Sequence, residues 1–353
     1  MAADRVARTL PRRGVTLRDV ARAAGVHPST VSRSLDPERA ALVNPATRAR
    51  VQEVARELDY EPDLVAKGLR NQRTHTIGIV VPDLGNPIYA QLVRGVNDAL
   101  EGRGYASLVS ETTDDSGRLD RTFSLFSRRR ADAVITASAR TNQATELRRI
   151  IRTGLPLVMA IRWIRGVPAP IVANDDRRGG TLAAEHLIEL GHTRVAQLHG
   201  PSDIETFVQR GLGFRDTAMT AGLDPPASLG PAGDPTVAEG DRLMSELLAS
   251  DGPRPTAVFA HNDLMAIGAI AALRRAGLAC PEDISVVGYN DSPIVEYLDP
   301  PLSTIRMPLT EIGRVAAETA LTLVDQGAAS AITPVSIALE PMLVPRESTR
   351  RIG

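Results

Sequence analysis

The sequence lacks most of the features that mark secreted, membrane-bound or disulfide-linked chains. Its single cysteine, Cys280, excludes an internal disulfide bond and fits a reducing cytosol. Its longest apolar run, residues 264–273, is about half of what a helix needs to span a bilayer. The first residues are charged and lack the apolar core of a signal peptide. We therefore expect a cytoplasmic protein with no membrane partner, in which Cys280 fills space rather than acting as a nucleophile.

The sequence motifs of common enzymes are missing as well. There is no P-loop, no G-x-S-x-G and no complete G-x-G-x-x-G, because the segment at residues 211–216 lacks the third glycine. The six histidines show no spacing typical of metal ligands. Two acidic pairs, Asp114-Asp115 and Asp175-Asp176, fall in predicted turns, where solvated helix capping is the expected role. These observations predict no catalytic residue, no cofactor and no metal site.

Charge is distributed unevenly along a chain whose net charge is only −1. Its 353 residues are enough for two or three domains. Residues 1–73 hold fourteen basic and nine acidic residues, a net charge of +5, and the remainder carries −6. A basic segment before an acidic body favours attraction to phosphate and opposes nonspecific binding by the body. We expect residues 1–14, which include four arginines, to form a disordered basic tail.

Residues 16–35 have the pattern of two short helices joined by a tight turn. The apolar residues of the first helix recur with a helical period and are Leu17, Val20, Ala21 and Ala24. Thr16, with Asp19 three residues later, resembles a capping box that starts this helix. Gly25 provides the left-handed backbone that ends it. Pro28 suits the first position of the second helix.

The second helix has an outer face suited to DNA. Val31 and Leu35 are its apolar anchors. The outward residues are Ser29, Thr30, Ser32 and Arg33. Small hydroxyl groups beside a guanidinium match the base edges and phosphates of a major groove. The segment predicts a helix-turn-helix, with a generic helical hairpin as the alternative reading.

Residues 45–75 complete the N-terminal helical segment and connect it to the rest of the chain. Residues 45–58 predict a third helix, with a buried stripe that completes a small helical domain at residues 15–60. Pro62 ends the preceding segment and opens a short helix over residues 63–69. That helix has too few apolar residues to form a core, and residues 70–75 indicate a linker.

From residue 76 onward, strand-length apolar runs alternate with helical segments. The runs are at residues 77–81, 107–109, 133–136, 157–161, 195–198, 257–260 and 284–289. Alternation of this kind predicts parallel sheets covered by helices on both faces. We therefore expect an α/β body of two doubly wound, parallel-sheet halves, beginning near residues 76 and 174.

The order of these features resembles the LacI/GalR family of bacterial transcriptional regulators over residues 15–349. The motifs that carry the resemblance are those at residues 16–26, 29–33, 63–69, 77–82, 186–192, 210–214, 262–268, 284–289 and 344–349. It implies a helix-turn-helix head (15–60), a hinge helix and linker (61–75), and a periplasmic-binding-protein-like effector-binding and dimerisation domain (76–349). The implied first subdomain covers residues 76–173 and 305–330, and the second covers 174–304 and 331–349.

The resemblance implies operator contacts in the head. His27, Pro28, Ser29 and Arg33 fall where the second helix enters the major groove. Thr16, Thr30, Ser32, Asn44 and Thr47 fall where phosphate contacts occur. Leu69 falls where an apolar wedge enters the minor groove of a palindromic operator. Two features depart from the family pattern: His27 stands where serine is usual, and the loop at residues 36–43 is longer than usual by about two residues.

The resemblance also implies an effector cleft between the two α/β halves. The expected cleft residues are Tyr89, Ile161, Trp163, Thr206, Arg210, Asn262 and Asn290. Ile161 and Asn290 stand where acidic residues are usual, and Pro235 stands where an aromatic is common. These changes leave Arg210 less neutralised, which favours an anionic or less hydroxylated effector over a simple sugar. Trp163 could replace the missing ring or pack in the core.

We therefore expect a ligand-responsive repressor that acts as a homodimer without a heptad tail for tetramerisation. Its partners would be palindromic operator DNA and a small effector such as a sugar, a sugar derivative or another metabolite. The alternative is a solute-binding protein of a transport system, which would explain the body but not the basic head.

Overall fold

The computed structural model describes residues 15–36, 39–60, 73–327 and 335–352. The chain divides into two compact units, residues 1–74 and 75–353. None of the helices in the described ranges has the length and apolar character that crossing a membrane requires.

The first unit is a small helical head. Its elements are α1 (Leu17–Ala23), α2 (Pro28–Ser34), the 3-10 turn η1 (Ala40–Leu42) and α3 (Pro45–Glu57). Val20, Val31 and Val51, one from each α-helix, are fully buried together. Gly25 has a φ of 63°, which lets the chain turn between α1 and α2 as the sequence predicts. The predicted third helix is confirmed to within one residue.

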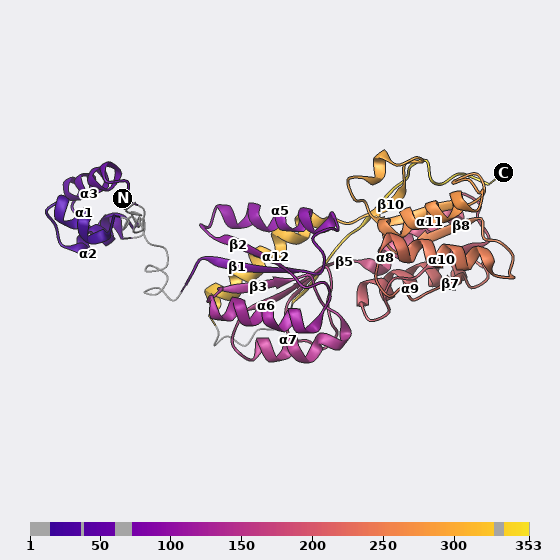
Figure 1. Cartoon of the computed structure of the whole chain (residues 1–353), viewed down its shortest axis with the longest axis horizontal. Coiled ribbons are helices and arrows are strands. Elements are labelled where there is room, and N and C mark those ends of the chain that lie inside the picture. The colour runs from indigo at the N-terminus through magenta and orange to yellow at the C-terminus, as the bar shows by residue number, and fades with distance from the viewer. Residues whose placement is uncertain (1–14, 37–38, 61–72, 328–334, 353) are drawn as a thin grey trace, which may run out of the picture. The chain divides into compact units, whose positions relative to one another are not determined.

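The second unit begins with a six-stranded parallel sheet. Its strands are β1 (Thr76–Val81), β2 (Ala106–Glu111), β3 (Ala133–Thr136), β4 (Leu157–Ala160), β5 (Ile171–Asn174) and β11 (Ser336–Leu339), in the order β11-β5-β4-β3-β1-β2. Helices α5 (Ile88–Glu101) and α12 (Leu309–Gln326) cover one face (Figure 1). Helices α6 (Ser116–Arg128) and α7 (Ala144–Ile151), with the 3-10 turn η2 (Thr141–Gln143), lie over the other.

A second six-stranded sheet forms the other half of this unit. Its strands are β6 (Val195–Leu198), β7 (Ala227–Leu229), β8 (Ala257–Ala260), β9 (Ser285–Asn290), β10 (Ser303–Arg306) and β12 (Met342–Val344), in the order β12-β10-β9-β8-β6-β7. Only β12 runs antiparallel to its neighbour. Helices α8 (Asp176–Glu189) and α9 (Glu205–Thr220) pack together, as do α10 (Val237–Ala249) and α11 (Asp263–Arg275), while η3 (Val295–Tyr297) precedes β10. The expected α/β body of two parallel-sheet halves is confirmed.

The chain passes between the two sheets after β5, after β10 and after β11. The predicted assignment of residues 331–349 to the second subdomain is wrong for β11, which pairs with β5 in the first sheet. Residues 305 and 306 belong to β10 in the second sheet, not to the first subdomain. These strands are only four residues long. Their pairing depends on partners distant in the sequence, which a local pattern does not reveal.

Helices α8 and α9 are in close contact through glycines. A Cβ added at Gly213 would overlap the backbone carbonyl oxygen of Arg177, and one added at Gly180 would overlap that of Arg210. The two helices can approach this closely only because neither position has a side chain. This contact sets the position of α9, which carries Thr206 and Arg210.

Gly213→Ala should lower the free energy of unfolding by about 1–3 kcal/mol, because the added methyl group meets backbone that cannot move aside. Urea denaturation followed by circular dichroism measures this change. Gly102→Ala is the matched control, since nothing lies within 4 Å of a Cβ at Gly102. Equal stability of the two variants would contradict the close helix contact.

Candidate DNA-binding face and ligand cleft

Helix α2 begins with a histidine cap. Nδ1 of His27 accepts the backbone N–H of Ser29 at 3.3 Å and lies 2.8 Å from the Ser29 hydroxyl oxygen. Pro28 occupies the first helical position, as predicted. His27 and Ser29 are exposed. His27 therefore defines where the helix starts, a structural role that the sequence pattern did not indicate.

The rest of the outer face of α2 is open to solvent. Arg33 is exposed and pairs with no carboxylate in the part of the chain that the structure describes. Thr30 and Ser32 are half-buried beside it. The helix therefore presents small polar groups and one available guanidinium, which is the donor set that base edges and phosphates require.

The other three residues expected at phosphates, Thr16, Asn44 and Thr47, lie at helix starts. The backbone N–H and hydroxyl of Thr16 donate to Oδ2 of Asp19 at 3.0 and 2.6 Å. Oδ1 of Asn44 accepts the N–H of Ala46 at 3.0 Å and caps α3. Thr47 is half-buried in the first turn of α3. Leu69 and the expected hinge helix lie outside the described residues.

In the second unit, a cavity of about 20 Å³ lies between the two subdomains, at the carboxyl ends of their strands. It is lined by Asn86, Ile88, Tyr89, Ile161, Arg162, Thr206, Phe207, Arg210, Pro235, Asn262 and Asn290. Six of the seven residues expected in an effector cleft are among them. A volume of this size holds about one water molecule, so the cavity has no room for a metabolite in this arrangement of the subdomains.

The seventh expected residue, Trp163, lies elsewhere. It is half-buried and packs against the hydrophobic cluster of the first subdomain that includes Ile164 and Val167. The expectation that Trp163 contacts an effector is therefore not supported, because this residue packs against the core and does not line the cavity. The alternative reading of this tryptophan as packing is the one that the structure favours.

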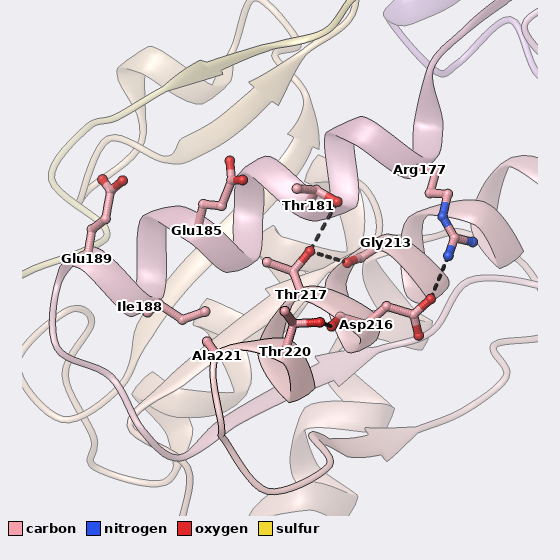
Figure 2. Close-up of a pocket in the computed structure, with 10 residues that line it drawn as sticks. All are labelled: Arg177, Thr181, Glu185, Ile188, Glu189, Gly213, Asp216, Thr217, Thr220 and Ala221. Carbon is pink, nitrogen blue, oxygen red and sulfur yellow. Dashed lines mark hydrogen bonds and ion pairs between the residues drawn. The ribbon is translucent and has the colours of Figure 1, made fainter.

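A larger cavity of about 550 Å³ lies in a groove between α8 and α9. Figure 2 shows that several of its polar groups bond to one another: the Thr217 hydroxyl oxygen lies 2.8 Å from the Gly213 carbonyl oxygen and 3.1 Å from the Thr181 hydroxyl oxygen, and Arg177 pairs with Asp216 at 2.6 Å. None of the expected cleft residues lines this groove. The smaller cavity between the subdomains is therefore the better candidate for an effector site.

Arg210 of α9 is part of a buried ion pair in the cleft wall. Its Nε donates to Oδ1 of Asp176 at 2.8 Å, and its NH1 donates to the carbonyl of His261 at 2.6 Å. The arginine and aspartate side chains are 3% and 2% exposed. The expectation of a poorly neutralised Arg210 is wrong, because Asp176 at the start of α8 pairs with Arg210 of the adjacent helix α9. The expectation that Asp176 lies in a solvated turn is wrong for the same reason.

Tyr289 extends this ion pair to the first sheet. Its hydroxyl donates to Oδ1 of Asp176 at 3.0 Å and accepts Nδ2 of Asn174 at 2.6 Å. Burial raises the pKa of Asp176, while its contacts with Arg210 and Tyr289 oppose that shift. Burial, and secondly the charge of Asp176, raise the pKa of Tyr289 well above its usual value, so the phenol stays protonated. The network joins β5 of the first sheet to α8 and β9 of the second.

A second buried pair joins Arg162 to Asp114. NH1 of Arg162 donates to both carboxylate oxygens of Asp114 at 2.8 and 2.9 Å. The expected solvated role is therefore wrong for Asp114 as well. It is confirmed for the other member of each acidic pair, since Asp115 caps α6 and Asp175 caps α8.

Three polar or strained positions complete the wall. Oδ1 of Asn262 caps α11 by accepting the N–H of Met265 at 2.7 Å, and its Nδ2 donates to the carbonyl of Pro235 at 2.8 Å. Ile161 and Asn290 have φ values of 65° and 117°. A left-handed backbone at a β-branched residue such as Ile161 is unusual, and such strain clusters at binding sites.

Several lining residues were not expected from the sequence. Arg162 is the most informative of these, because it follows Ile161 at the carboxyl end of a predicted strand, where ligands of parallel sheets bind. That position was a usable signal. Asn86, Ile88 and Phe207 offered none, because their loops and helix turns reach the cleft only through the tertiary fold.

Together, the head and the body define a class: a helix-turn-helix domain joined to a two-subdomain, periplasmic-binding-protein-like body. The model of the bacterial regulatory proteins of the lacI family matches residues 16–63, and that of the periplasmic binding protein-like domain matches residues 184–349. The ribose operon repressor of Escherichia coli (strain K12) is 35% identical over 334 residues, covering 94% of this chain and 99% of the relative. The chain belongs to the LacI family.

Solved structures agree with this assignment. The lac repressor dimer bound to operator and the anti-inducer ONPF is 28% identical, with a TM-score of 0.83 over 96% of this chain and 100% of that one. The complex of the transcriptional regulator CelR with cellobiose is 32% identical, with a TM-score of 0.70 over 95% of this chain and 99% of that one. The protein is a DNA-binding transcriptional regulator of the repressor type with an effector-binding body. The alternative of a transport solute-binding protein finds no support among these relatives.

Tyr289→Phe should lower the free energy of unfolding by about 1–3 kcal/mol, because it leaves Asn174 without its acceptor and Asp176 with one donor fewer. Denaturant unfolding at neutral pH measures the loss. Tyr297→Phe is the control, since Tyr297 is 80% exposed. An unchanged midpoint for Tyr289→Phe would show that the buried network contributes nothing.

Proposed function

We propose that the head reads operator DNA by placing α2 in the major groove. The observation that supports this is the solvent-open outer face of α2, with Arg33 available one turn beyond Ser29. Arg33 pairs with a guanine, a contact that contributes about 1–3 kcal/mol of discrimination. The residues assigned to phosphates, which set the register without reading sequence, are Thr16, Thr30, Ser32, Asn44 and Thr47.

We propose that two copies of the chain bind one palindromic operator. Each head covers one half-site, and a symmetric dimer supplies two heads with matching spacing. The similar lac repressor is a dimer bound to operator. The wedge role of Leu69 in the minor groove stays a prediction on the resemblance alone. A regulator of chromosomal DNA acts in the bacterial cytoplasm, where we place this protein.

We propose that the effector of this regulator binds in the cavity between the subdomains. Tyr89, Thr206, Arg210, Asn262 and Asn290 supply an aromatic surface and polar groups from both subdomains. A ligand that touches both walls favours one relative arrangement of the subdomains over another. Because the similar CelR was solved with cellobiose, a sugar or sugar-derived metabolite is the class to test first. Binding then changes operator affinity by a coupling energy of about 1–3 kcal/mol.

Arg33→Ala should weaken binding to the preferred operator by about 5- to 150-fold and relax the preference at one guanine in each half-site. Selection from a randomised duplex library, followed by sequencing, measures both effects. Arg56→Ala is the control, because Arg56 pairs with Glu53 on α3 at 2.9 Å. A loss that is uniform over all sequences would instead place Arg33 at a phosphate.

Thr206→Val should raise the effector concentration needed for a half-maximal change in operator affinity by about 2- to 10-fold, because the cleft loses one hydroxyl at constant shape. Fluorescence anisotropy of an operator duplex, titrated with ribose and with cellobiose, measures it. Thr319→Val in α12 is the control, since its hydroxyl bonds to the carbonyl of Val315 within its own helix. Identical titration curves for Thr206→Val and the wild type would remove Thr206 from the site.

A further inference from the structure

Arg140 connects the two subdomains at the edge of the cleft. It follows β3 in the first subdomain, and its NH1 donates to both carboxylate oxygens of Asp203 at 3.2 and 3.1 Å. Its NH2 donates to Asp234 at 2.8 Å. Both aspartates belong to loops of the second subdomain. Beside this contact, the backbone N–H of Thr141 donates to the carbonyl of Asp203 at 2.8 Å.

Arg140 is far better shielded than an ordinary surface ion pair. Its side chain is 14% exposed, whereas Asp203 and Asp234 are 37% and 67% exposed. A second pair across the cleft, Arg165 with Glu205 at 3.4 Å, involves an arginine that is 79% exposed. Exposed pairs contribute little, so among these cross-cleft pairs Arg140 dominates the closed arrangement.

Asp114 is shared between Arg140 and the interior of the cleft. Its Oδ2 lies 3.4 Å from Nε of Arg140, and both its oxygens accept NH1 of Arg162. Burial raises the pKa of Asp114, but the guanidinium groups of Arg162 and Arg140 outweigh burial and hold that pKa below its usual value. Asp114 is therefore a fixed negative charge between two arginines.

Opening the cleft changes the local charge. In an open cleft, Asp203 and Asp234 would lie away from Arg140 with the second subdomain, and Arg140 and Arg162 would share Asp114 alone. Because Arg140 and Arg162 carry two positive charges and Asp114 carries one negative charge, this wall of the open cleft would have a net positive charge. An incoming negative group restores the balance before the second subdomain closes.

Arg162 has more unbonded donors at the cleft wall than Arg210. In the described part of the chain, Arg162 uses NH1 alone for its hydrogen bonds, so its Nε and NH2 groups stay unbonded at the cleft wall. Arg210 is bonded to Asp176 and to His261, and its NH2 lies 3.6 Å from the Met307 sulfur. The lining of the cavity contains no carboxylate.

We propose that Arg162 is a further effector-binding residue that selects an anionic group, carboxylate or phosphate, and that Arg140 is a positioning residue acting through the shared Asp114. Arg140 orients Arg162 in the open cleft and, with Asp203 and Asp234, closes the second subdomain over the bound group. This inference rests on the proposed effector site and names the chemistry of its ligand.

Calorimetric titration of the full-length protein tests the ligand chemistry. The probes are matched sets: ribose with ribonate and ribose 5-phosphate, and glucose with gluconate, glucuronate and glucose 6-phosphate. At least one acid should bind about tenfold or more tightly than its neutral counterpart. Each set contains a carboxylate and a phosphate derivative of one sugar, so the acid that binds shows which of the two groups the site accepts. Arg162→Gln should abolish this preference, and Arg162→Lys should keep part of it.

Hydrogen–deuterium exchange at Thr141 tests the role of Arg140 without any ligand. In Arg140→Ala, the Thr141 amide should exchange about tenfold faster, since its bond to Asp203 forms only when the cleft is closed. Arg314→Ala is the matched control, because Arg314 pairs with Glu311 and Glu318 on its own helix. Arg140→Lys should restore part of the protection.

Three results would overturn the inference: neutral sugars that bind as tightly as the acids, an acid preference that survives Arg162→Gln, or no acid in either set that binds. An unchanged Thr141 exchange rate in Arg140→Ala would overturn the positioning role. Operator binding by the wild-type protein is measured separately. If it is present while the acid preference is absent, this inference fails and the proposed regulator stands; if no duplex is bound, the proposed function fails.

Discussion

The buried pair of Arg210 and Asp176 is the contact on which the body depends most. It lies where the chain leaves β5 and begins α8, so it joins the first sheet to the second at a crossover. A buried charge needs an oppositely charged partner, and loss of one partner leaves an uncompensated charge in the interior. Tyr289 and Asn174 extend the same network to both sheets.

Arg210 and Arg162 both line the cavity, but they make different contacts. Arg210 is bonded to Asp176 and to the carbonyl of His261, and the close contact of α8 with α9 places it there. Arg162 keeps donors available and shares its carboxylate with Arg140, which reaches the opposite subdomain. Arg210 therefore connects α9 to the start of α8, and Arg162 is the arginine that we propose selects the charge of the ligand.

Local patterns predicted the head and the body well. The start of α2 at Pro28, the turn at Gly25 and the alternation of strands with helices all depend on residues a few positions apart. Six of the residues that line the cavity were also expected, on the resemblance to the family. The role predicted for the two acidic pairs was correct for only one residue of each pair. Asp115 and Asp175 cap the helices that follow them, but Asp114 and Asp176 turn inward to arginines distant in the sequence.

What the sequence by itself determined is therefore whatever depends on neighbours along the chain: helix starts and ends, strand positions, the charge contrast between head and body, and the family. The tertiary structure alone decided that β11 joins the first sheet, that Trp163 packs in the core and that Arg162 faces the cleft. The physical reason is that burial and ion pairing are set by groups brought together from separate loops. An isolated segment has the same residues whether its charges end in water or against a partner.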